Sequence, residues 1–236
     1  MQPPSLYTLA GSLNSVFIIV SLYGLWSQLQ KIWRRKRDAG IGAGQTTDIL
    51  SINQFTVSFL AYCAFFVYGY SITPFNHYIV WPRLVASLIA LAILFEIDRD
   101  RLSLASRNAL LACALLLCAG VAGLAFGPTF TDEKRVLSQS LIVAVTVLLA
   151  QGYAHQIHLI YRSGRTGAVS LKMSQFILAM DVSTIFFACV MGLKTGWPLL
   201  LLACVSATTK LIIMWLFRWE KTSPAARMKR QAPACG

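Results

Sequence analysis

Charge is scarce in this chain, and acidic residues are the scarcest of the charged types. Of 236 residues 13% are charged, with 9 Asp and Glu against 21 Lys and Arg, whereas 56% are hydrophobic. Soluble domains carry about twice that share of charged residues. The few carboxylates form no catalytic pair, and no glycine-rich phosphate loop or nucleophile motif occurs. The composition therefore predicts an integral membrane protein and argues against an enzyme.

Metal-binding patterns are also lacking. The six cysteines include no CxxC pair, and five of them fall in apolar stretches, where free cysteine serves as a small packing residue: Cys63, Cys113, Cys118, Cys189 and Cys204. His155 and His158 have a helical spacing that suits a metal, but the sequence offers no third ligand beyond Asp181. We predict no metal site and no cofactor.

Long apolar runs, in contrast, are abundant. A hydrocarbon core of about 30 Å needs about 20 helical residues, and continuous runs rather than alternating ones indicate helices, not strands. The sequence therefore predicts an all-α membrane protein with seven spans, near 8–29, 51–71, 78–96, 107–127, 136–160, 171–193 and 197–218.

Basic residues gather on one side of these spans. Sixteen follow the first, third, fifth and seventh spans, whereas the opposite side has only Arg83, Lys134, Arg135 and Lys194. Because basic loops stay in the cytoplasm, we expect the N-terminus outside and the C-terminus inside, in the inner membrane if the source is bacterial. The basic tail, 219–236, is expected to be disordered and to contact lipid rather than nucleic acid.

The second half of the sequence resembles the first. The segment 24–34 aligns with 152–162, Gln54-Phe55 with Gln175-Phe176, and Trp81-Pro82 with Trp197-Pro198, at offsets of 128, 121 and 116 residues. These matches predict a three-helix repeat at 8–96, a linker helix at 107–127 and a second repeat at 136–218. A three-helix unit ends on the side of the membrane opposite its start, and the single linker helix brings the chain back. The arrangement is therefore 3+1+3, with parallel repeats.

The second repeat also resembles the PQ-loop superfamily, which includes SWEET sugar facilitators, SemiSWEETs, cystinosin-like exporters and the KDEL receptor. The resemblance is carried by Gln156, Tyr161-Arg162, the run Thr-Gly-Ala-Val-Ser-Leu at 166–171, and Gln175-Phe176. It implies a secondary transporter of a small polar solute, a sugar or an amino-acid-like molecule, that alternates access between the two repeats.

The name-giving Pro-Gln pairs are replaced by Ser27-Gln28 and His155-Gln156. In the family those prolines bend the helices at the inner gate, because proline removes a backbone hydrogen bond. Gly24 and Gly152, one turn earlier, are therefore the candidate hinges, with close helix packing as the alternative role. The predicted gating residues are Gly24, Ser27, Gln28, Gly152, His155 and Gln156.

Asp181 and Lys210 lie within predicted spans, where a charge is costly. Counting about 1.5 Å per residue puts them and His155 about 10 to 13 Å from the cytoplasmic end, in one layer. Asp181 and Lys210 form either a structural ion pair or a functional site, in which Asp181 with His155 carries a proton or the pair binds a zwitterion. The first repeat has Leu60 opposite Asp181 in this alignment.

Polar side chains near the midplane complete the predicted substrate site, which comprises Asn14, Tyr62, Ser87, Asp181, Ser183, Ser206 and Lys210. Two other functions stay open on these residues. One is a peptide or sorting receptor of the KDEL type, and the other is a retinal photoreceptor that uses Lys210. The expected partners are a small solute and membrane lipid, and homo-oligomerisation is left open.

Overall fold

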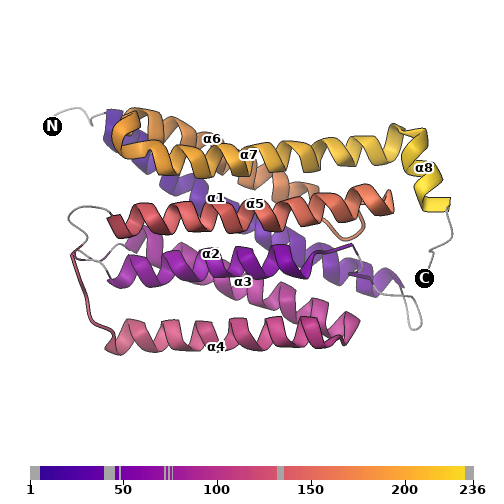
Figure 1. The fold of residues 1–236 in the computed structure, drawn as a ribbon, viewed down its shortest axis with the longest axis horizontal. Coiled ribbons are helices and arrows are strands. Elements are labelled where there is room, and N and C mark those ends of the chain that lie inside the picture. Colours follow the sequence, from indigo (N-terminus) through magenta and orange to yellow (C-terminus); the bar gives the residue numbers. More distant parts are fainter. Residues whose placement is uncertain are drawn as a thin grey trace.

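The computed structural model describes residues 6–39, 46–47, 49–71, 73, 75, 77–131 and 136–231. This part of the chain contains eight helices: α1 (Leu6–Ala39), α2 (Ile52–Ser71), α3 (His77–Arg101), α4 (Leu104–Phe126), α5 (Val136–Ser163), α6 (Leu171–Met191), α7 (Leu193–Thr222) and α8 (Pro224–Gln231) (Figure 1). The first seven are long and apolar enough to cross a membrane. The predicted all-α fold with seven membrane-length helices is confirmed.

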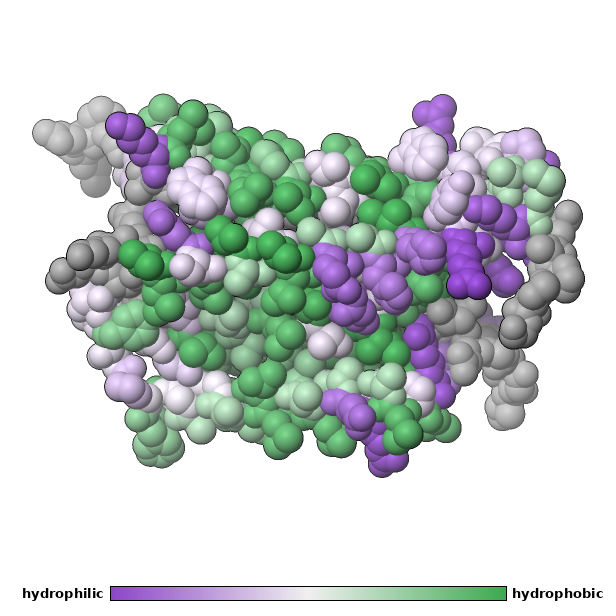
Figure 2. Space-filling model, in the orientation of Figure 1, coloured by the Kyte–Doolittle hydropathy of each residue, from purple (hydrophilic) through white to green (hydrophobic). Residues whose placement is uncertain are grey.

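The surface of the bundle explains how it suits a lipid environment. Apolar side chains cover its middle, and hydrophilic side chains gather towards the end where α8 lies (Figure 2). We call this end the basic end, because it carries basic residues of α1, α3 and α5, including Arg37, Arg101 and Arg162. Many large apolar residues of the spanning helices are exposed, among them Val16, Ile19, Leu115, Val147 and Leu211.

The segment after the seventh span differs from the prediction. α7 continues to Thr222, and α8 follows directly, so the described part of the predicted disordered tail is helical. Lys229 Nζ donates to the carbonyl of Tyr161 at 2.9 Å, and the fully buried Ala226 packs beside Gly164. These contacts hold α8 against the end of α5. Residues 232–236 of that tail lie outside the described residues.

The helix contacts occur in matched pairs. α1 contacts α3 and α6, while α5 contacts α7 and α2; α2 packs on α3 as α6 packs on α7. Exchanging α1, α2 and α3 for α5, α6 and α7 reproduces this set of contacts. α4 contacts only α2 and α3 among the described helices, and lies at one edge of the bundle (Figure 1). This is the packing that a duplicated three-helix unit with a peripheral linker requires.

Two glycines allow the closest of these crossings. A Cβ on Gly24 of α1 would lie 2.9 Å from Phe176 Cβ and 3.3 Å from Met173 Cα on α6. A Cβ on Gly152 of α5 would overlap Val57 Cγ2 and lie 3.1 Å from Gln54 Cα on α2. Both glycines therefore serve close helix packing, the alternative to the predicted hinge.

We predict that Gly152→Ala destabilises the protein by about 1 to 3 kcal/mol, because the methyl group meets the stiff Val57 side chain and the α2 backbone. The measurement is the thermal unfolding midpoint in detergent. Gly120→Ala is the matched control, since its Cβ would lie 3.4 Å from Phe66, an ordinary contact. Adding Val57→Ala should restore much of the loss, and equal midpoints for Gly152→Ala and Gly120→Ala would contradict the close crossing.

Candidate functional site

Gln28 of α1 reaches across the bundle to the segment that precedes α6. Its Nε2 donates to the carbonyl of Ala168 at 2.7 Å, and its Oε1 accepts from the backbone N–H of Ser170, also at 2.7 Å. Gln28 is fully buried. Because both ends of the amide are used, the side chain satisfies two backbone groups that would otherwise be buried without partners.

Gln156 of α5 makes the same two bonds to the segment that precedes α2. Its Nε2 donates to the carbonyl of Ile49 at 2.8 Å, and its Oε1 accepts from the N–H of Ser51 at 2.7 Å. We call these two arrangements the glutamine clamps. Each joins one half of the bundle to the other near the basic end, so the two predicted gating glutamines are brought into equivalent places.

The clamps correct the sequence alignment of the second helices. Ile49 and Ser51 take the places of Ala168 and Ser170, an offset of 119 residues. The glycine contacts agree, because Gln54 and Val57 face Gly152 as Met173 and Phe176 face Gly24. The offset of 121 expected from Gln54-Phe55 and Gln175-Phe176 is wrong by two residues. In the corrected register the counterpart of Asp181 is Tyr62, not Leu60.

The residues that precede the glutamines strengthen the clamps. Ser27 Oγ lies 3.1 Å from Ser170 Oγ, and His155 Nδ1 lies 2.7 Å from Ser51 Oγ, so both positions reach the opposite half of the bundle. Each serine also caps the helix after it: Ser51 Oγ accepts from the N–H of Gln54, and Ser170 Oγ from that of Met173. Polar side chains here therefore add contacts that proline could not make.

The segments held by the clamps are also tied to the third helix of their own half. Thr47 Oγ1 donates to Asp100 Oδ2 of α3, and Thr166 Oγ1 donates to Glu220 Oε2 of α7, both at 2.6 Å. The N–H of Leu50 bonds the carbonyl of Thr47, as that of Val169 bonds Thr166. A rigid turn in each half thus presents its backbone to the glutamine of the other half.

A second group of side chains, which we call the charge cluster, lies inside the bundle. It contains Asp181 on α6, Lys210 and Ser206 on α7, Arg83 on α3, Tyr62 on α2 and Tyr153 on α5. Asp181 is 3% exposed and Lys210 1%. The charges of Lys210 and Arg83 both act on the Asp181 carboxylate, and the Ser206 hydroxyl faces it. Five helices therefore contribute to one site, in which Asp181, Lys210, Ser206 and Tyr153 are buried, and Arg83 and Tyr62 are half-buried.

Asp181 is not neutralised by a close ion pair. Within the described residues, the ion pairs shorter than 4.0 Å are Lys36 with Glu96 at 2.6 Å and Arg230 with Glu220 at 3.9 Å. Asp181 Oδ2 is buried and has no hydrogen-bond partner among the described residues. The structural ion pair that the sequence suggested is therefore not formed as a direct contact, and a carboxylate oxygen remains available inside the protein.

The two cations of the cluster rest on aromatic rings. Lys210 Nζ lies 3.4 Å from the centroid of the Tyr153 ring. The Arg83 guanidinium lies 5.6 Å from the centroid of Tyr62 and 5.4 Å from that of Phe65. A ring face attracts a cation without neutralising it, so these contacts reduce the cost of burying the charges and leave the charges in place.

The other predicted site residues lie elsewhere. Asn14 Oδ1 accepts from Ser183 Oγ at 3.0 Å and from Thr184 Oγ1 at 2.8 Å, so these residues join α1 to α6. Ser87 Oγ donates to the carbonyl of Arg83 within its own helix. Of the predicted substrate residues, the charge cluster contains Tyr62, Asp181, Ser206 and Lys210.

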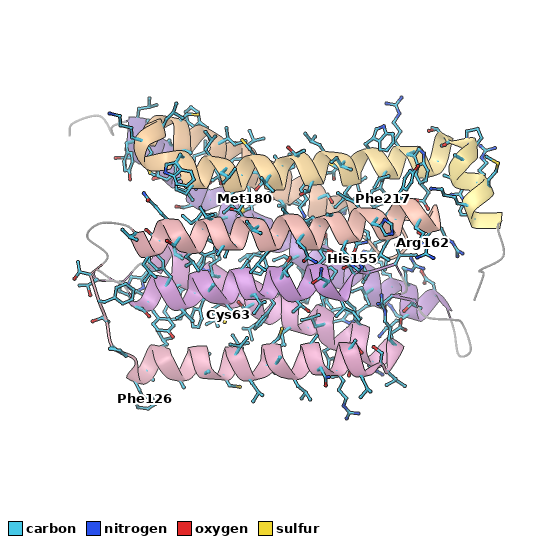
Figure 3. The ribbon with its side chains drawn as sticks, viewed as in Figure 1. Cys63, Phe126, His155, Arg162, Met180 and Phe217 are labelled. Atoms are coloured by element: carbon cyan, nitrogen blue, oxygen red, sulfur yellow. The ribbon has the colours of Figure 1, made fainter. Side chains whose placement is uncertain are left out.

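His155 does not join the predicted layer with Asp181 and Lys210. It is exposed, and it lies on the side of α5 that faces α2, in an open cleft of about 440 Å³ that Thr56 and Ala105 also line (Figure 3). Its contact is with Ser51 in the clamp. Equal depth along two helices does not fix the direction of a side chain, which explains why the prediction was wrong.

Sequence reasoning missed Arg83 and Tyr153. Arg83 was counted with the outer loops, although it lies within the predicted span at 78–96, and an arginine inside a span is itself a signal of a polar interior. Tyr153 follows Gly152 directly and carried no signal of its own. No family model, curated protein or solved structure matches this chain.

We predict that Gln156→Ala lowers the thermal unfolding midpoint, because the buried Ser51 N–H and Ile49 carbonyl lose their partner, at a cost of about 1 to 3 kcal/mol for each group. Gln28→Ala should have a similar effect, since its clamp has the same bonds. Gln175→Ala, an exposed glutamine on α6, is the control and should leave the midpoint unchanged. Equal midpoints for all three variants would show that the clamps carry no stability.

Proposed function

We propose that this protein is a secondary transporter of a small polar solute, which alternates access as one half of the bundle moves against the other. The observation that supports it most is the charge cluster: a carboxylate with one oxygen unpartnered among the described residues and a lysine, both buried inside a bundle of membrane-length helices, with a half-buried arginine beside them. Buried charges at such depth are expensive for stability and mark solute or ion pathways.

The paired helix contacts support the same mechanism. The halves meet through α1 with α6 and α2 with α5, and the clamps lie on these two contacts near the basic end. Opening the bundle at that end requires the four clamp hydrogen bonds to break. We take this end as cytoplasmic, from its basic residues, and the two halves as PQ-loop-type repeats.

We also propose that Asp181 binds the proton that would couple transport to a pH gradient. It is the acidic residue of the cluster, it is nearly inaccessible, and one of its oxygens lacks a partner among the described residues. His155, which lies in the clamp and not in the cluster, would act at the gate instead.

A disulfide across a clamp tests alternating access. In a background without native cysteines, Ser27→Cys with Ser170→Cys should cross-link, because the two hydroxyl oxygens are 3.1 Å apart on opposite halves. We expect oxidation to stop counterflow of labelled glucose, alanine or lactate in proteoliposomes, and a reductant to restore it, since the bond keeps the basic end closed.

The control is Ser103→Cys with Ser106→Cys, a pair at the same end that does not join the two halves and whose hydroxyl oxygens are 3.0 Å apart, which should leave transport active when oxidised. Transport by the fully oxidised Ser27–Ser170 pair at the reduced rate would refute movement of the halves at the clamp. Uptake no faster than in protein-free liposomes for all three solutes would refute the transport proposal.

Proton coupling predicts that Asp181→Asn abolishes accumulation driven by a pH gradient but keeps solute exchange, because exchange needs no net proton movement. The same change at the exposed Asp38, near the end of α1, is the matched control and should keep both modes. Loss of both modes in Asp181→Asn, or loss of folded protein, would assign Asp181 a structural role.

A further inference from the structure

We infer that the charge cluster is built to bind a small monocarboxylate anion, with Arg83 and Lys210 as its two cationic contacts and Asp181 as the group that limits the charge of the ligand to one. This inference rests on the proposed transport function and names its substrate class. The inference depends most on Arg83, which the distribution of basic residues assigns to the outer loops but which lies within α3.

The charges of the cluster do not balance. Arg83 and Lys210 contribute two positive charges, and Asp181 contributes one negative charge. Arginine stays protonated in proteins, and the Tyr153 ring under Lys210 Nζ attracts the lysine when it is charged. An anion with one charge would bring the cluster to neutrality. A neutral sugar would leave the excess charge, and a cation would increase it, so both are disfavoured at this depth.

The positions of the two cations suit a ligand that passes between them. Arg83 lies six residues into α3, near the end away from the basic end, whereas Lys210 lies near the middle of α7. With Leu94 as the counterpart of Lys210, the Cα positions of the two differ in depth by 11 residues, about 16 Å, but the Arg83 guanidinium extends to the ring of Tyr62, which the corrected register sets opposite Asp181. An anion entering from the outer end therefore meets Arg83 first.

Arg83 and Lys210 can donate hydrogen bonds to the carboxylate of a ligand, because neither is paired with a carboxylate of the described residues. Neither cation has an acidic oxygen within 4.0 Å among the described residues. A guanidinium presents parallel N–H donors that match a carboxylate, and an ammonium adds further donors. The Tyr62 hydroxyl lies beside the same charges and offers a neutral donor for the rest of an organic acid.

The test compares lactate with lactamide, which has the same shape and no charge, by isothermal titration of the full-length protein in detergent at constant ionic strength. We expect lactate to bind and lactamide and glucose not to bind. Arg83→Gln should weaken lactate about tenfold or more, as loss of a charged hydrogen bond does, while Arg83→Lys keeps part of the affinity. Arg162→Gln, an exposed arginine at the end of α5, is the control and should bind lactate as the unchanged protein does.

Charge-changing variants test the limit set by Asp181. Asp181→Asn should bind succinate, a dianion, more tightly than lactate, which reverses the preference of the unchanged protein. Lys210→Gln should lose lactate binding, because the cluster is then neutral without a ligand. Asp181→Asn combined with Lys210→Gln leaves Arg83 as the one net positive charge of the cluster. This double variant should again prefer lactate over succinate. Its binding would show that loss of lactate binding in Lys210→Gln is not caused by misfolding.

Equal binding of lactate and lactamide, or a succinate preference that does not change with Asp181→Asn, would overturn the inference. Transport of glucose without any binding of lactate would overturn it as well and would leave the transport proposal standing. Lactate binding that depends on Arg83, in a protein that moves no solute across liposomes, would support the anion site and refute transport.

Discussion

The hydrogen bonds of two glutamines, Gln28 and Gln156, are the interaction on which the arrangement of the halves depends. Each amide satisfies a donor and an acceptor in a turn of the opposite half, where no water or lipid could do so. Apolar contacts between helices cannot provide this specificity, because lipid chains are as apolar as the helices themselves. The clamps therefore fix which surfaces of the halves meet, and the glycine crossings at Gly24 and Gly152 follow one turn away.

The same lack of solvent explains the charge cluster. A lone charge inside the bundle would be prohibitive, yet Asp181, Lys210 and Arg83 lie together with aromatic rings under both cations. The rings and the mutual attraction lower the cost but leave one carboxylate oxygen without a partner among the described residues. If Asp181 served packing alone, a direct ion pair with Lys210 or Arg83 would be expected. A buried ion pair with all its hydrogen bonds made costs less free energy than a buried carboxylate with an unpartnered oxygen.

The sequence could predict the seven apolar helices, because their length and composition are sufficient. It could also predict the equivalent places of Gln28 and Gln156, because both lie in a repeated segment. It could not predict which face of a helix turns inward. In a membrane both lipid and the bundle interior are apolar, so hydrophobic periodicity does not separate them. For that reason the sequence placed His155 beside Asp181. Arg83 is a different case, because it lies within the predicted span at 78–96, where an arginine is itself a signal of a polar interior. The Gln-Phe match between α2 and α6 arose from common residue types, and only the clamp bonds revealed the register of 119.

The clamps are symmetric, but the cluster is not. In the corrected register Tyr62 stands opposite Asp181, and at the Trp-Pro offset of 116 Lys210 corresponds to Leu94 and Arg83 to Leu199. A solute such as a monocarboxylate has no twofold axis, so a site between two equivalent halves can match it only if the halves differ there. Joining both halves in one chain permits this difference, because each can then change without the other. Under the proposed transport, symmetry is kept at the clamps, where the halves would open and close alike, and is lost where a single asymmetric solute would bind.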